Sequence, residues 1–106
     1  MEDVRVEPLH RFGRALSDPT RCRILLCLLH EPHYPTELAE HLGLTKANMS
    51  NHLACLRDCG LVTAVQEGRR QRYELADAQL AHALDDLAAL AAQIGTNVGA
   101  VEGVAS

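Results

Sequence analysis

The sequence is poor in aromatic residues, since Trp is absent, Phe occurs once and Tyr twice among 106 residues. Its core must therefore be built mainly from Leu, Ala and Val, a composition typical of helical proteins. A chain of this length forms one domain, and a domain this small gains stability from a permanent partner. We therefore expect a single helix-rich domain that dimerises.

Long apolar runs are also missing. No stretch approaches the roughly 20 apolar residues that span a bilayer, and the N-terminal segment carries charges where a secretory signal needs an apolar run. We therefore expect a cytoplasmic protein. In a reducing compartment, the four cysteines are more typical of free thiols, metal ligands or redox groups than of a disulfide framework.

Positive charge is absent from the C-terminal third, where residues 74–106 include five acidic residues and no Lys or Arg. The formal net charge of -4 would by itself argue against a nucleic-acid partner. Between residues 45 and 73, however, the local charge is +3. This asymmetry indicates a basic working surface on an otherwise acidic body.

Residue spacing and punctuation by Pro and Gly predict five helices and one β-hairpin. We expect helices over residues 4–16, from Pro19 to a proline-containing break at 31–35, over 36–43, over 46–59, and from 78 to Gly95. Strands are expected over 61–65 and 71–75, with a turn at 67–70. The predicted fold class is mainly α with a β-hairpin wing (α+β): a single winged helix-turn-helix domain over residues 1–94, followed by a mobile tail over 95–106.

The segment that begins at Lys46 has the pattern of a DNA-recognition helix. Met49, Leu53 and Leu56 fall on one side, whereas short polar residues and alanines fall on another, where they can approach base edges. The basic hairpin that follows resembles a wing, although a short arginine cluster is more often an ordinary solvated surface. The predicted DNA-binding residues are Thr45, Lys46, Ala47, Asn48, Ser50, Asn51, His52, Arg57, Arg69, Arg70 and Arg72.

Two cysteines, Cys55 and Cys59, lie one helical turn apart on the predicted recognition helix. This spacing suits two thiolates that hold one cation, which is half of a tetrahedral site. An arbitrary pair of this kind is more often a pair of small core residues, and the geometry suits an intrahelical disulfide poorly. The residues alone leave packing and metal binding open.

The segments SDPTRCRIL, ELAEHLGLTKANMSNHLACLRDCGLV and EGRRQRYEL resemble the ArsR/SmtB family of winged-helix metal-sensing repressors, and within it the CmtR branch. The resemblance covers residues 10 to 90. It implies a homodimer that binds a palindromic operator and changes its DNA affinity on binding a divalent metal. It also implies an interface between the first and last helices, for which we expect Leu9, Phe12, Leu80, Leu84 and Leu87.

The CmtR branch further implies that Cys55 and Cys59 are thiolate ligands for cadmium or lead. That branch completes the site with a cysteine in the C-terminal tail, and QIGTNVGAVEGVAS contains none. We therefore expect a further ligand from His52, His10, His33 or the partner chain. A mixed sulfur and nitrogen site would favour zinc, nickel or cobalt over lead.

Three alternatives stay open at this point. The chain could bind DNA but respond to oxidants, or it could receive its metal signal through an accessory corepressor protein that binds nickel. It could also be an interaction module without DNA binding, which a flat salt dependence would reveal. We expect no enzymatic activity, because the sequence has no phosphate-binding Gly-rich loop, nucleophile elbow or HExxH motif.

Overall fold

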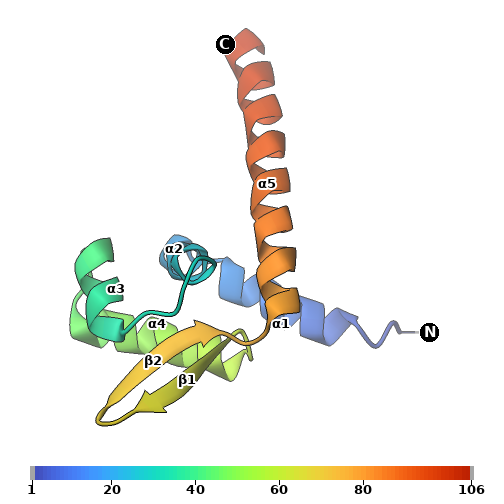
Figure 1. Ribbon diagram of the computed structural model, residues 1–106. Coiled ribbons are helices and arrows are strands. Elements are labelled where there is room, and N and C mark those ends of the chain that lie inside the picture. The colour runs from blue at the N-terminus through green and yellow to red at the C-terminus, as the bar shows by residue number, and fades with distance from the viewer. Residues whose placement is uncertain (1, 106) are drawn as a thin grey trace.

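The computed structural model describes residues 2–105, with side chains through residue 95. It has the predicted α+β winged helix-turn-helix architecture, in which five helices accompany one antiparallel two-stranded sheet (Figure 1). The elements are α1 (Val6–Leu16), α2 (Pro19–Leu28), α3 (Pro35–Leu42), α4 (Lys46–Asp58), β1 (Val62–Glu67), β2 (Arg70–Leu75) and α5 (Ala78–Ala105).

Side chains at the helix starts explain several boundaries. Asp18 accepts a hydrogen bond from the Arg21 amide at 3.0 Å, and Thr45 accepts one from the Asn48 amide at 3.1 Å. Asp77 accepts one from the Leu80 amide at 2.7 Å. Each cap satisfies an amide that has no partner within its helix, and so fixes where α2, α4 and α5 begin.

The hairpin is longer than its sequence pattern predicted. Glu67 pairs with Arg70 in the antiparallel register, so the turn consists of Gly68 and Arg69 alone. Gly68 has a φ of +61°, which a glycine adopts at low cost at the first central position of a tight hairpin turn. Pairing also extends beyond the hairpin, because His33 and Tyr73 form an isolated antiparallel bridge.

The core lies between α2, α3, α4 and the base of the hairpin. Its most deeply buried large side chains come from each of these elements and are Ile24, Leu25, Leu38, Met49, Leu53, Leu56 and Val62. All of them are aliphatic, as the scarcity of aromatic residues requires. The core therefore ties the helix-turn-helix and the wing into one unit.

Helix α5 rises from the base of the hairpin and points away from the rest of the molecule (Figure 1). The radius of gyration is accordingly 15.9 Å, larger than the roughly 13 Å of a compact domain of about 100 residues. The prediction that this helix ends at Gly95 was wrong, since α5 continues to Ala105. The side chains of residues 96–106 lie outside the described residues, so a mobile tail over 95–106 stays a prediction. Within the described residues, no helix is both long and apolar enough to cross a membrane.

Candidate nucleic-acid interface and thiol pair

Helix α4 separates apolar and polar side chains on opposite sides. Met49, Leu53 and Leu56 are buried in the core. The opposite side is exposed and consists of Lys46, Ala47, Asn48, Ser50, Asn51, Ala54 and Arg57, preceded by the exposed cap residue Thr45. This surface offers short hydrogen-bonding groups between two cations, an arrangement that suits base edges flanked by phosphates.

His52 lies apart from this exposed surface, although it was predicted among the DNA-binding residues. Its side chain is 22% exposed, and its Nδ1 lies 3.9 Å from a carboxylate oxygen of Asp18, the residue that caps α2. Arg21, in the first turn of α2, donates to the carbonyls of Ala15 and Arg14 at the end of α1. His52 therefore faces the residue that begins α2 rather than the exposed surface of α4.

The three wing arginines have different surroundings. The Arg70 guanidinium lies 3.5 Å from the centre of the Tyr34 ring, and Arg72 Nη1 lies 3.5 Å from Glu67 Oε2. Arg69 is exposed in the turn and has no ion-pair partner among the described side chains. That all three arginines contact DNA stays a prediction, and among the described side chains Arg69 alone of the three has neither an ion-pair nor a ring partner.

Tyr34 and Glu67 belong to the same region and were missed by sequence reasoning. The Tyr34 hydroxyl donates to Glu67 Oε1 at 2.8 Å. That hydrogen bond is the main reason why the pKa of Tyr34 lies above its ordinary value. No local signal could have found the pair, because the two residues are 33 positions apart and meet only after the wing has folded.

Cys55 and Cys59 both lie half-buried near the end of α4. The backbone amide of Cys59 donates to the Cys55 carbonyl at 3.1 Å. Burial raises the pKa of the Cys59 thiol, and the neighbouring Cys55 sulfur raises it further, whereas the positive charges of Arg14 and Arg11 act in the opposite direction. The thiol pair therefore lies at the end of α4, close enough to α1 for the charges of its arginines to act on Cys59.

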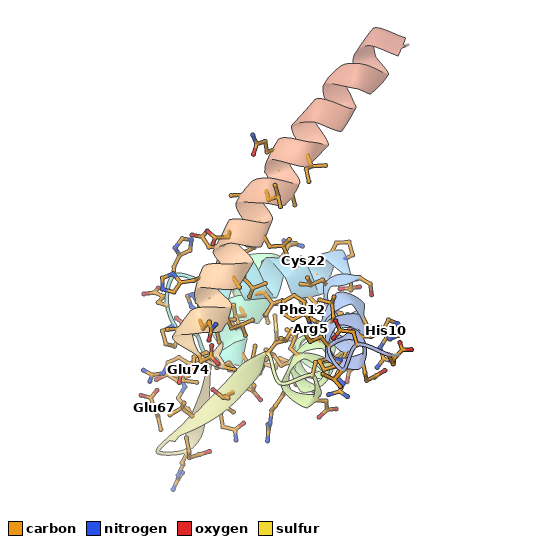
Figure 2. The ribbon with its side chains drawn as sticks, turned by 90° about the vertical axis from the view of Figure 1, so that its right-hand side faces the viewer. Arg5, His10, Phe12, Cys22, Glu67 and Glu74 are labelled. Atoms are coloured by element: carbon orange, nitrogen blue, oxygen red, sulfur yellow. The ribbon has the colours of Figure 1, made fainter. Side chains whose placement is uncertain are left out.

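The predicted further ligands lie elsewhere. Within the described residues, no group of three His, Cys, Asp or Glu side chains is arranged to hold a metal ion. His52 contacts Asp18, and His33 lies 4.0 Å from Glu31 and 3.9 Å from Glu37. His10 lies on the outer, exposed side of α1 (Figure 2). One protomer therefore supplies two sulfur donors at this position, which is half of a tetrahedral set.

The predicted dimer residues divide into two groups. Leu84 is 5% exposed and belongs to the core of its own protomer, against which Phe12 and Leu80 also pack. Leu9 and Leu87 are exposed, and so are the apolar residues Val4, Val6, Leu26, Leu90 and Ile94. The exposed group lies on α1, α2, α5 and the segment before α1, and leaves an apolar surface that the described chain does not cover.

Known proteins share both the sequence and this arrangement. The model of the arsR family of bacterial regulatory proteins matches residues 18–64. Over 95 residues the chain is 56% identical to the HTH-type transcriptional regulator CmtR of Mycobacterium tuberculosis, covering 90% of this chain and 80% of CmtR. The probable mercury resistance operon repressor of Streptomyces lividans is 42% identical over 71 residues, covering 67% of this chain and 57% of the repressor.

Two solved structures extend the comparison. The NMR structure of the cadmium metal-sensor CmtR from Mycobacterium tuberculosis matches with a TM-score of 0.64 and 64% identity, over 74% of this chain and 81% of that one. A homodimeric winged helix-turn-helix DNA-binding domain from Mycobacterium bovis matches with a TM-score of 0.80 and 27% identity, over 87% and 89%. The chain therefore belongs to the arsR family of bacterial regulatory proteins and is a winged-helix transcriptional regulator.

Proposed function

We propose that this protein is a homodimeric transcriptional repressor that binds a palindromic operator and releases it when Cys55 and Cys59 bind a divalent metal ion. One observation carries the proposal: a single helix, α4, has the exposed polar surface on one side and both sulfur atoms near its end. Metal binding at the two thiols would therefore act directly on the helix that contacts DNA. A repressor of this kind acts in the cytoplasm, where its operator is.

The operator contacts would come from α4 and the wing. Ser50 and Asn51 provide hydrogen-bonding groups for base edges, while Lys46, Arg57 and Arg69 provide charge for phosphates. All five are exposed, so DNA can approach them without rearrangement of the core. In a dimer related by a twofold axis, two such surfaces would meet two half-sites of a palindrome.

The effector would be a thiophilic or borderline ion, namely cadmium, lead, zinc or nickel. Two thiolates are suitable ligands for ions of this kind. The relatives also include a cadmium sensor and a probable mercury resistance repressor. Cys59 follows the last residue of α4, so its ligation together with Cys55 would fix the final helical turn. The partner protomer would supply the remaining donors, because the described residues of one protomer do not.

Titration of metal into the reduced protein tests this proposal. We expect thiolate-to-metal absorption in the ultraviolet and a fall in operator affinity measured by fluorescence anisotropy. Cys55→Ser and Cys59→Ser should each weaken metal binding by at least about tenfold and abolish metal-dependent release, because each removes one of two sulfur ligands.

Cys22→Ser is the matched control. The Cys22 sulfur donates to the Leu16 carbonyl at 3.2 Å, and a serine hydroxyl can make the same hydrogen bond. This variant should respond to metal as the unmodified protein does. If Cys55→Ser left metal affinity and operator release unchanged, the thiol-based mechanism would be wrong, and an oxidant or a metal-carrying partner protein would become the better explanation.

A further inference from the structure

Tyr34 connects the helix-turn-helix to the wing. It precedes the first residue of α3, and its backbone amide donates to Glu37 Oε1 at 2.9 Å, which fixes it to the first turn of that helix. Its hydroxyl donates to Glu67 Oε1 at 2.8 Å, and the Arg70 guanidinium covers its ring at 3.5 Å. One side chain thus contacts both strands of the wing at their turn end.

Glu67 holds a second wing residue with its other oxygen. Glu67 Oε2 lies 3.5 Å from Arg72 Nη1, on the opposite strand. The Arg72 Nε is buried, although the side chain as a whole is 36% exposed. Figure 2 shows Glu67 near the tip of the hairpin and Glu74 nearer its base. Glu67 is therefore placed to organise the tip.

The backbone next to Tyr34 reinforces this connection. The His33 amide donates to the Tyr73 carbonyl at 3.0 Å, and the Tyr73 amide donates to the His33 carbonyl at 2.8 Å. Tyr73 itself is 8% exposed and belongs to the core. The segment before α3 therefore fixes the wing by backbone pairing at its middle and by side chains at its tip.

We infer that Tyr34 and Glu67 are positioning residues, which hold the wing at a fixed angle to α3 and α4, and that Arg69 is the wing residue that contacts a DNA phosphate. Arg70 contacts the Tyr34 ring and Arg72 contacts Glu67, whereas Arg69 lies exposed in the turn with no ion-pair partner among the described side chains. This inference rests on the proposed DNA-binding function. It adds that Tyr34 and Glu67 fix the orientation of the wing, and that Arg69 is the wing arginine that contacts a phosphate.

The salt dependence of operator binding separates these two roles. A side chain that contacts a phosphate contributes to the slope of log affinity against log salt, whereas a residue that only orients the wing does not. Tyr34→Phe removes one hydroxyl and should weaken operator binding roughly three- to tenfold, the effect of one ordinary hydrogen bond on an exposed surface, with an unchanged slope.

Tyr73→Phe is the matched control for that variant, because it removes the same hydroxyl from the only other tyrosine of the chain. The Tyr73 hydroxyl makes no hydrogen bond to any described residue, so affinity and slope should both stay unchanged. If Tyr34→Phe bound the operator as tightly as Tyr73→Phe does, the positioning role would be overturned.

Arg69→Gln should weaken binding and reduce the magnitude of the salt slope by about 1. Arg23→Gln, which removes an exposed charge from α2, should leave the slope unchanged. If Arg69→Gln left the slope unchanged, the phosphate contact assigned to Arg69 would be wrong.

Glu67→Gln distinguishes positioning from simple charge neutralisation. If Glu67 positions the wing, this variant should bind more weakly, and the double variant with Tyr34→Phe should lose less affinity than the two single losses combined, because both changes act on the shared Tyr34–Glu67 contact. Tighter binding with a steeper slope would instead show that Arg70 and Arg72 contact phosphates once freed, and would overturn the inference. Glu74→Gln controls for the loss of a wing carboxylate.

Operator binding by the unmodified protein distinguishes a failure of the proposed function from a failure of the positioning inference. Absence of salt-dependent operator binding by it would contradict the proposed function itself. Normal binding with an unaffected Tyr34→Phe variant would contradict the positioning inference alone. Circular dichroism melting curves of each variant establish that the folded protein is being compared.

Discussion

At the scale of single residues, Cys59 has the environment that matters most for metal binding. Burial and the adjacent Cys55 sulfur raise its pKa above the ordinary value, while Arg14 and Arg11 oppose that increase. The thiol is therefore protonated at neutral pH, and a metal ion must displace its proton in order to bind.

Metal affinity should consequently increase with pH. A raised pKa keeps the protonated form of Cys59 dominant at neutral pH, so displacement of its proton contributes about a tenfold gain in affinity per pH unit until this thiol ionises by itself. Chelator competition between pH 6 and 8 measures this dependence.

Arg14→Gln provides the comparison for this measurement. Removing a positive charge that favours the thiolate should raise the pKa of Cys59 further, so the pH at which metal affinity stops increasing should move upward. A pH-independent affinity would show that the thiols are not the ligands.

The residues of the DNA-binding surface could be predicted where helical periodicity alone decides whether a side chain is buried or exposed. Ser50 and Asn51 are exposed and Met49 is buried, as their spacing indicated. His52 could not be placed in this way, because its surroundings include Asp18, from another helix. Tyr34 was missed for the same reason, since its partner Glu67 belongs to a distant part of the chain.

At the scale of elements, the connection between α3 and α4 depends on Gly43. This residue has a φ of +69°, in the left-handed region, and its amide donates to the Glu40 carbonyl at 3.4 Å. The next amide, that of Leu44, donates to the Ala39 carbonyl at 2.9 Å. The chain thereby leaves α3 and reaches the Thr45 cap of α4 within three residues.

Gly43→Ala should destabilise the protein by about 1 kcal/mol, because a Cβ is strained at this φ even though nothing lies within 4 Å of it. Gly43→Asn should cost less, since Asn tolerates the left-handed region better than Ala. Thermal or urea unfolding measures both values. Equal stability of Gly43→Ala and the unmodified protein would contradict this account of the turn.

Backbone conformation at glycines explains why the ends of α3 and α4 were predicted correctly and the end of α5 was not. Gly43 and Gly60 follow helices and have positive φ values. Gly95 was expected to act similarly, but it lies within α5 and has no positive φ. A glycine ends a helix only where the chain turns to pair the last carbonyls, and at Gly95 the backbone makes no such turn.

At the scale of the whole molecule, the exposed apolar side chains of α1 and α5 favour a partner surface. A homodimer would cover them, and the elongated α5 presents several on one helix. The five residues predicted for the interface, Leu9, Phe12, Leu80, Leu84 and Leu87, therefore fall into a group that packs in the core and a group that is exposed. Leu84 serves the core of its own protomer, whereas Leu9 and Leu87 are available to a partner.

Leu87→Asp should therefore weaken dimerisation while leaving the protomer folded. A twofold interface contains this residue twice, and loss of two buried leucines costs about 3 kcal/mol or more, equivalent to a dissociation constant at least about a hundredfold higher. Sedimentation velocity over a concentration series measures the change.

Ala89→Asp introduces the same charge two positions along α5, on the opposite side of the helix from Leu87. It should leave the dimer intact. If Leu87→Asp sedimented as the unmodified protein does, α5 would not form the interface through this side.

The three-residue connection between α3 and α4, together with the attachment of α3 to the wing through Tyr34, has a mechanical consequence. If Tyr34 holds the wing as inferred, the recognition helix and the wing move as one body, and metal binding at the thiols then changes their mutual orientation little. Metal binding can instead alter the distance between the two DNA-binding units of a dimer, each of which consists of α4 and the wing of one protomer. An operator with a lengthened or shortened spacer between its half-sites should then compensate for part of the effect of metal, which a panel of spacer lengths would reveal.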